Sequence, residues 1–87
     1  MPMTIEFTPN GWADYVYWQT EDRKTLRRIN RLIEDICRNG NEGIGKPEPL
    51  IGDFSGYWSR RINEKDRLIY RLEGETVSIL ACRYHYG

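Results

Sequence analysis

The length and composition of the chain set the first limits on its structure. Its 87 residues are enough for one domain, and 39% are hydrophobic, including three Trp and six Tyr whose rings bury much apolar area. No apolar run is long enough to span a membrane, and the chain lacks the charged and then apolar start of a secretory signal. We therefore expect a single domain over residues 1–87, located in the cytoplasm and without membrane attachment.

The charge is balanced overall but unevenly distributed. Thirteen basic and thirteen acidic residues give a net charge of zero, which by itself argues against a nucleic-acid-binding protein. Such a chain can still present one basic face. Residues 23–38 contain two acidic residues, Glu34 and Asp35. The basic residues of the same segment outnumber them: Arg23, Lys24, Arg27, Arg28, Arg31 and Arg38. A solvated helix surface is nevertheless the simpler explanation for the basic residues from 23 to 31.

The cysteines and the single histidine do not suggest a metal site. Cys37 and Cys82 lack CxxC spacing, and together with His85 they fall short of a four-ligand set. We expect no metal and no other cofactor, and reduced thiols packed as small apolar groups.

The first half of the chain has the pattern of one strand and two helices. Residues 3–7 alternate apolar and polar side chains, as a strand does. Thr8-Pro9 is a helix-start signal, and this first helix should reach about Trp18. A second start at residues 20–22 precedes a longer helix whose apolar residues recur every three or four positions, with its end at Asn39-Gly40.

The segment from Asn39 to Gly56 has the composition of a long loop. It holds five of the eight glycines together with Pro47 and Pro49. Long loops in compact domains are usually functional or disordered. Because a proline stands on each side of Glu48, the backbone there is restricted, and we expect that carboxylate to be presented rigidly.

The last third of the chain predicts three strands, at residues 57–62, 67–72 and 76–86, with turns between them. The order strand, helix, helix, strand, strand, strand predicts an α+β fold. In it the two N-terminal helices cover one face of a mostly antiparallel sheet, and the other face stays open.

Three residues could cleave RNA through the 2′-hydroxyl of the substrate. That reaction needs a base for the 2′-OH proton, a cation for the charge on the phosphate, and an acid for the leaving 5′-oxygen. Glu48, Arg67 and His85 offer these groups. Neighbouring antiparallel strands would bring Arg67, at the start of one strand, near His85 at the end of the next.

Arg61, Arg83 and Tyr86 are candidate helpers, and the two-residue period of a strand would place Arg83 on the same face as His85. Each of the three main candidates also has a simpler explanation. The histidine could be a surface residue, the arginine could pair with a turn carboxylate, Asp66 or Glu64, and the glutamate could be a solvated acid. Taken one by one, these simpler explanations are favoured.

Four strings of the sequence resemble the YoeB family of bacterial toxins, part of the wider RelE-like group. They are residues 45–50 (GKPEPL), 55–62 (SGYWSRRI), 67–70 (RLIY) and 81–86 (ACRYHY), and residues 12–19 (WADYVYWQ) extend the likeness to the first helix. The resemblance implies a RelE-like microbial ribonuclease fold. It also implies a toxin of a type II toxin–antitoxin pair, a metal-independent endoribonuclease that cleaves mRNA at the ribosomal A site and stops translation.

The resemblance also implies partners and roles for individual residues. Family members pair as homodimers and bind a YefM/Phd-like antitoxin, through which alone they reach operator DNA. The family base falls on Glu48, the phosphate-binding arginine on Arg67, the acid on His85 and the final tyrosine on Tyr86. Arg61 matches a family position that contacts RNA, and Lys46 and Arg83 are further candidates for RNA binding.

Three positions depart from the family pattern. Ile51 stands where the best-known members carry Lys, Asp66 stands where a His is familiar, and Gly87 displaces the terminal carboxylate by one residue. The charge of Asp66 could occupy the neighbouring Arg67. Two other functions are considered: a toxin that binds DNA gyrase without cutting RNA, and a decayed toxin that serves as an antitoxin or operator partner. The presence of the Glu, Arg and His set argues against both.

Overall fold

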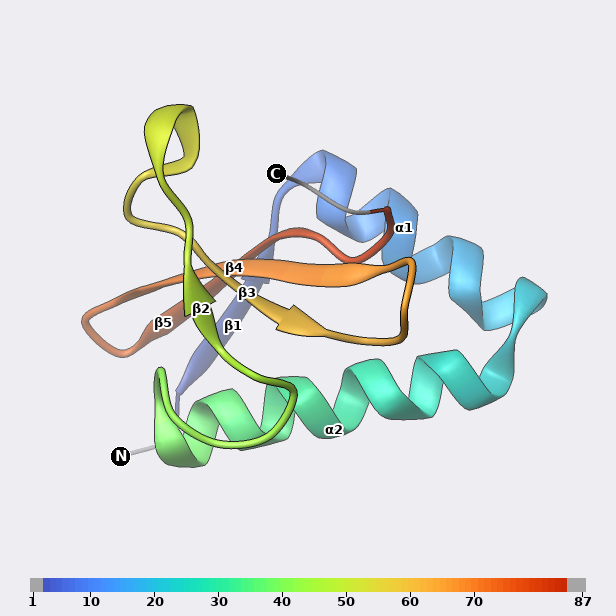
Figure 1. Ribbon diagram of the computed structural model, residues 1–87. Helices are drawn as coiled ribbons and strands as arrows, with labels where there is room; N and C mark the ends of the chain where they lie inside the picture. The colour runs from blue at the N-terminus through green and yellow to red at the C-terminus, as the bar shows by residue number, and fades with distance from the viewer. Residues whose placement is uncertain (1–2, 85–87) are drawn as a thin grey trace.

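Two helices and a five-stranded sheet form the part of the chain that the computed structural model describes, residues 3–84 (Figure 1). In chain order the elements are β1 (Thr4–Phe7), α1 (Pro9–Glu21), α2 (Arg23–Asn39), β2 (Glu48–Pro49), the short 3₁₀ helix η1 (Gly52–Phe54), β3 (Trp58–Arg61), β4 (Arg67–Glu73) and β5 (Thr76–Ala81). The strand order across the sheet is β1-β5-β4-β3-β2, with β1 parallel to β5 and the other pairs antiparallel. The predicted α+β class is confirmed.

Side-chain caps define where the helices begin. The hydroxyl of Thr8 accepts the Gly11 N–H at 3.0 Å, with Pro9 in the first turn. Asp22 begins α2 by accepting the N–H groups of Lys24 at 3.0 Å and Thr25 at 3.2 Å. The first helix thus continues to Glu21, beyond its predicted end, because the break comes only at Asp22. No helix within residues 3–84 is long and apolar enough to cross a membrane.

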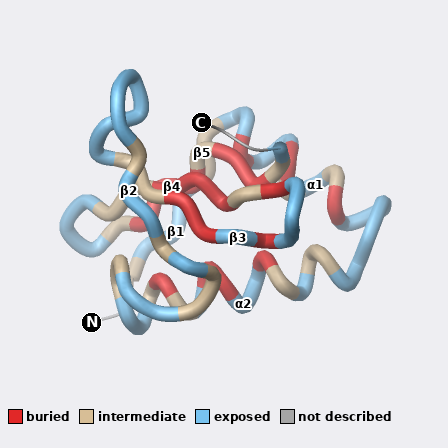
Figure 2. Tube along the Cα trace, in the orientation of Figure 1, coloured by how far each residue is buried: buried red, intermediate tan, exposed pale blue. Residues whose placement is uncertain are grey.

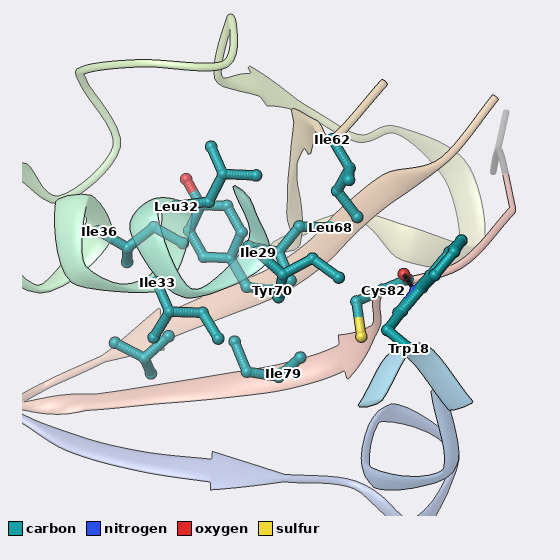
Figure 3. Close-up of a cluster of buried hydrophobic side chains, with 11 residues drawn as sticks. Trp18, Ile29, Leu32, Ile33, Ile36, Ile62, Leu68, Tyr70, Ile79 and Cys82 are labelled. Atoms are coloured by element: carbon teal, nitrogen blue, oxygen red, sulfur yellow. Dashed lines mark hydrogen bonds between the residues drawn. The ribbon is translucent and has the colours of Figure 1, made fainter. Parts of the chain in front are cut away.

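Both helices pack on the same face of the sheet, as predicted. Trp18 of α1 and an isoleucine and leucine stripe on α2 enter one core cluster with side chains of β4 and β5 (Figure 3). The buried stretch of α2 faces the sheet, while its other side is exposed (Figure 2). The cluster comprises Trp18, Ile29, Leu32, Ile33, Ile36, Ile62, Leu68, Tyr70, Val77, Ile79 and Cys82.

The segment predicted as a plain loop contains a strand. β2 is only two residues long and pairs with β3 at the sheet edge, Glu48 opposite Ser59 and Pro49 opposite Trp58. A strand this short, with a proline in it, gives no periodic signal in the sequence, and proline is tolerated because the strand lies at an edge. The chain then extends away from the sheet over residues 50–57 (Figure 1).

The last strand ends at Ala81, so the prediction of a strand through residue 86 was wrong for residues 82–84. A bulge precedes this end: Tyr70 pairs with Ile79 but Ile69 with Ala81, which leaves Leu80 as the extra residue. The peptide groups of the next residue, Cys82, are taken by side chains of α1 instead of a neighbouring strand. Asp14 accepts its N–H at 3.0 Å, and the Trp18 indole donates to its carbonyl at 2.7 Å.

Both cysteines are free, as predicted. Cys82 is fully buried in the core cluster, and this burial raises the pKa of its thiol to about 12, with the carboxylates of Asp14 and Asp66 acting in the same direction. The thiol therefore stays protonated at neutral pH and behaves as a small apolar group.

An ion pair between the buried Arg60 and the partly buried Asp35 joins α2 to β3. The guanidinium of Arg60, which has no exposed surface, donates a short hydrogen bond to Asp35. That bond is the largest cause holding the pKa of the Asp35 carboxyl below its ordinary value, and partial burial opposes it. Hydrogen bonds from the Ile44 N–H and the Asn39 side chain also lower the pKa.

The first turn of α1 lies directly against the backbone of β5. A Cβ built on Gly11 would stand 2.3 Å from the carbonyl oxygen of Ile79. Glycine is therefore required here by close approach, although it lies inside a helix, where alanine is ordinarily preferred.

We expect Gly11→Ala to destabilise the protein by about 1–3 kcal/mol, because the new methyl group would push α1 away from β5. Helix propensity alone would predict the opposite sign, a gain of about 0.5–1 kcal/mol. Urea unfolding followed by circular dichroism measures the difference, with the exposed Gln19→Ala on the same helix as control. A Gly11→Ala variant as stable as the wild type would contradict this packing.

We also expect the stabilising effect of Asp35 to depend on pH. Because its pKa is lowered in the folded state, the effect is complete above the unfolded pKa of about 3.9 and is lost as the pH falls through the folded pKa. The stability difference between wild type and Asp35→Asn should therefore shrink between about pH 4 and pH 2. Urea midpoints measured across that range test this, and a constant difference would refute it.

Candidate functional site

The strand register places three of the predicted site residues on the open face of the sheet. Glu48 is paired with Ser59, and Ser59 is paired with Ile69, so the side chains of Glu48, Ser59 and Ile69 project from the same face of the sheet. Arg61 and Arg67 are paired with each other two residues further along the same strands, and they share that face. It is the face opposite the two helices.

The two arginines of this face stand directly opposite each other on β3 and β4. Directly opposed residues of an antiparallel pair have Cβ atoms about 4.5–5.5 Å apart, and like charges in that position repel. Among residues 3–84 the ion pairs are Arg60–Asp35 and Arg71–Glu73, so no carboxylate in that part of the chain neutralises Arg61 or Arg67. Two opposed arginines that lack a carboxylate partner among the described residues have the charge and hydrogen-bond donors that an anion such as a phosphate requires.

The turn between β3 and β4 orients the side chain of Arg67. One terminal nitrogen, Nη1, donates to the carbonyl of Asn63 at 2.7 Å, to that of Asp66 at 3.1 Å and to that of Glu64 at 3.4 Å. The side-chain oxygen of Asn63 fixes the turn by accepting the N–H groups of Lys65 and Asp66, each at 2.8 Å. The turn thus holds the guanidinium through carbonyl groups and leaves its charge available.

Asp66 does not occupy Arg67 as the sequence suggested it could. Its carboxylate is buried and accepts the N–H of Tyr84 at 2.7 Å and the side-chain amide of Asn63 at 3.1 Å. The main-chain N–H of Arg67 donates to the carbonyl of Tyr84 at 2.9 Å. The N–H and the carbonyl of Tyr84 are therefore both hydrogen-bonded to residues at the start of β4. His85 and Tyr86, which the sequence nominated as acid and helper, lie outside the described residues.

Arg83 is held against α1. Its guanidinium carbon lies 3.6 Å from the ring centroid of Tyr17 and 4.5 Å from that of Tyr84, two cation–π contacts. Because β5 ends at Ala81, the two-residue alternation that was to relate Arg83 to His85 does not apply. No pattern in the sequence indicates this contact, because Tyr17 is one of several aromatic residues on α1.

The two remaining positions flank the site in the loops around β2. Lys46 is exposed and has a positive φ of 51°, two residues before Glu48. Ile51 is 86% exposed just beyond β2, an unusual position for an isoleucine. The side chain at position 51 therefore adds exposed apolar surface three residues after Glu48, where a lysine would add charge.

The sequence analysis did not identify the residues that pack beside the candidate site residues or that build the turn next to them. Ser59 and Ile69 are buried between Glu48 and β5 in the same cross-strand row, and Asn63 and Asp66 build the turn and its link to the chain end. The alternation in β3 and β4 could have indicated the first pair, and Asn at the start of a four-residue turn the second. Within residues 3–84, no three His, Cys, Asp or Glu side chains are close enough together to hold a metal ion.

Comparison with known proteins adds independent evidence. A family model described as the YoeB-like toxin of bacterial type II toxin-antitoxin systems matches residues 7–86. The toxin YoeB of Streptomyces coelicolor is 56% identical over 97% of this chain and 100% of its own length.

Solved structures agree with that match. The YoeB dimer of Staphylococcus aureus superposes with a TM-score of 0.92 at 45% identity, covering 99% of this chain and 100% of the other. The toxin in a YoeB–YefM complex from the same species gives 0.90 at 44% identity, with the same coverage of both chains. The chain therefore belongs to the YoeB toxin family of type II toxin–antitoxin systems and has its RelE-like fold.

Proposed function

We propose that this toxin is a ribosome-dependent, metal-independent endoribonuclease that cleaves mRNA at the A site and thereby inhibits translation. One observation carries the proposal: the opposed arginines of β3 and β4, Arg61 and Arg67, lack a counter-ion within residues 3–84 and share a sheet face with the carboxylate of Glu48. An anion site beside a base is what cleavage by the 2′-hydroxyl requires.

Each residue then has a defined role in the reaction. Glu48 accepts the proton of the 2′-hydroxyl, whose oxygen attacks the adjacent phosphorus and displaces the 5′-oxygen of the next nucleotide. Arg67, assisted by Arg61, binds the phosphate oxygens as negative charge builds on them. His85 donates a proton to the leaving 5′-oxygen, and Tyr86 assists at the same phosphate. The products are a 2′,3′-cyclic phosphate and a free 5′-hydroxyl.

The contacts of Tyr84 support the assignment of His85. The residue directly before the histidine is hydrogen-bonded through both its peptide N–H and its carbonyl at the start of β4, where Arg67 lies. Lys46 and Arg83 complete the proposed RNA-binding set. Arg83 would act partly by its contacts with Tyr17 and Tyr84, which place positive charge next to the chain end.

The relatives suggest the partners. Staphylococcus aureus YoeB has been solved as a dimer and in complex with YefM. We propose that this chain likewise forms a homodimer and binds a YefM/Phd-like antitoxin, reaching operator DNA only through it. Its place of action is the cytoplasm, where ribosomes and mRNA are found.

Replacing the base or the acid should abolish toxicity without unfolding the protein. We expect Glu48→Ala and His85→Gln each to slow mRNA cleavage by about 10²–10⁴, the usual contribution of general acid–base catalysis. Growth after induction, and mapping of mRNA ends in a purified translation system, measure the effect. Glu75→Ala, in the exposed hairpin between β4 and β5, is the matched control.

Full toxicity of both variants would reject this assignment. Growth arrest by the wild type without new mRNA ends would favour a toxin that acts by binding, such as a gyrase poison. A wild-type chain without toxicity that still binds an antitoxin and its operator would favour the decayed toxin.

Restoring a positive charge beside Glu48 should strengthen RNA binding. Because the side chain of Ile51 is largely exposed, Ile51→Lys changes no packing and adds one cation next to the site. For single-stranded RNA, one added phosphate contact should steepen the slope of log K against log salt by about 0.7. Binding titrations at several salt concentrations test this, with Ile51→Gln as the uncharged control. An unchanged slope would show that position 51 lies off the RNA path.

A further inference from the structure

The loop that leads to Glu48 is tied to β3 from two sides. On the side of the main chain, the N–H of Arg61 donates to the carbonyl of Gly45 at 2.7 Å, and Glu48 itself pairs with Ser59. On the side of the core, the intervening residue of β3, Arg60, sends its side chain under the same loop. Three consecutive residues of β3, Ser59, Arg60 and Arg61, therefore contact the segment between α2 and β2 from its main-chain side and from its core side.

The buried side chain of Arg60 is fully used in this contact. Its guanidinium donates to the carbonyls of Gly40 at 2.6 Å, of Glu42 at 3.0 Å and of Ile44 at 3.0 Å, in addition to the Asp35 carboxylate. Its Nε donates to the hydroxyl of Tyr70 at 3.3 Å. That hydroxyl donates in turn to the side chain of Asn41 at 3.1 Å. Four residues of the loop are thus held by Arg60, three of them directly and Asn41 through the hydroxyl of Tyr70.

The loop is built to fit around this ion pair. Gly43 has a φ of 127°, and a Cβ there would stand 2.0 Å from an oxygen of Asp35. Gly45 has a φ of 82°, and a Cβ there would stand 2.8 Å from the Leu32 side chain and 3.3 Å from the Cβ of Arg60. Only glycine meets both the positive φ and the lack of space, so the observed path of the loop over the guanidinium requires glycine at both positions.

The main-chain pairing of β2 is too small to hold Glu48 without this support. β2 has two residues, and one is a proline, which has no N–H for the ladder. Ordering each loop residue costs about 1–2 kcal/mol of backbone entropy, while a hydrogen bond contributes about 0.5–1.5 kcal/mol net. The buried contacts of the preceding loop therefore contribute much of what fixes the position of Glu48 relative to Arg61.

We propose that Arg60 is a positioning residue for catalysis: from the core side it fixes the loop that sets the carboxylate of Glu48 opposite β3. The inference rests on the proposed role of Glu48 as the base. Arginine is needed because its planar fork serves several carbonyls and a carboxylate at once, whereas a lysine ammonium has three donors at one point.

The test is Arg60→Lys, which keeps the charge but not the fork. We expect the single-turnover rate of mRNA cleavage on purified ribosomes to fall by up to about 100-fold, the effect of a displacement of about 1 Å at a reacting group. Affinity for RNA should stay within about twofold, because Arg61 and Arg67 on the open face keep their places and Lys46 is the one proposed RNA contact in the loosened loop. Amide hydrogen exchange of residues 40–46 should accelerate in the same variant.

Two further variants separate positioning from stability. A core variant at Ile29, to Val or Ala as needed to match the stability of Arg60→Lys, lies away from the loop and should keep the wild-type rate per folded molecule. Tyr70→Phe removes only the hydroxyl between Arg60 and Asn41, so it should fold and show a smaller change in the same direction. It keeps the inference testable if Arg60→Lys does not fold.

The outcomes are distinct. Slower cleavage with faster loop exchange and unchanged RNA affinity would support the positioning role. A cleavage rate equal to that of the matched Ile29 variant would overturn it, as would a loop whose exchange is unaffected. If the wild type itself failed to cut RNA, the proposed function would fall and the catalytic role of Arg60 with it, while faster loop exchange in Arg60→Lys would still show that the arginine anchors the loop.

Discussion

The pairing of β3 with β2 on one side and with β4 on the other determines which side chains reach the site and which reach the core. Because neighbouring residues of a strand point to opposite faces, Arg60 enters the core and Arg61 the open face, although the two are identical and adjacent. A slip of one residue would exchange them and leave an unpaired guanidinium among apolar side chains, at a cost of several kcal/mol. The buried bonds of Arg60 to Asp35 and to the loop carbonyls make that slip unfavourable, so the core contact that stabilises the fold also fixes the register of the site.

The sequence predicted the elements with strong periodicity and missed those defined by single contacts. The stripe on α2, the strands β3 and β4, and the placing of both helices on one face follow from side-chain patterns. β2 and the end of β5 do not, because a two-residue strand has no period and the end of β5 is set by Asp14 and Trp18, distant in sequence. For the proposed site, Glu48 and Arg67 could be nominated from the sequence, but their common face could be seen only from the observed strand register. Asp66 was expected to affect the neighbouring arginine, whereas it binds Tyr84, a partner 18 residues away.

A neutral protein can still concentrate charge where it is needed. In the described part of the chain, Arg60 and Asp35 neutralise each other within the fold, and Arg71 and Glu73 do so at its surface. Arg61 and Arg67 are left without such a partner there, so positive charge is concentrated at this pair in spite of a net charge of zero. Exposed charges more than about 8–10 Å away are largely screened at physiological salt, and the local pair therefore matters more to an approaching phosphate than the total charge.

The bulge at Leu80 determines which face of the sheet Ala81 and Cys82 occupy. Ile79 and Cys82 both lie in the core cluster although they are three residues apart, a spacing at which a regular strand would send them to opposite faces. One additional residue thus reverses the orientation of the chain just before the segment that carries the histidine. Length in this stretch is consequently constrained more tightly than composition: a conservative exchange of Leu80 keeps Ala81 and Cys82 on their present faces, whereas deletion of that one residue would turn the thiol of Cys82 away from the core.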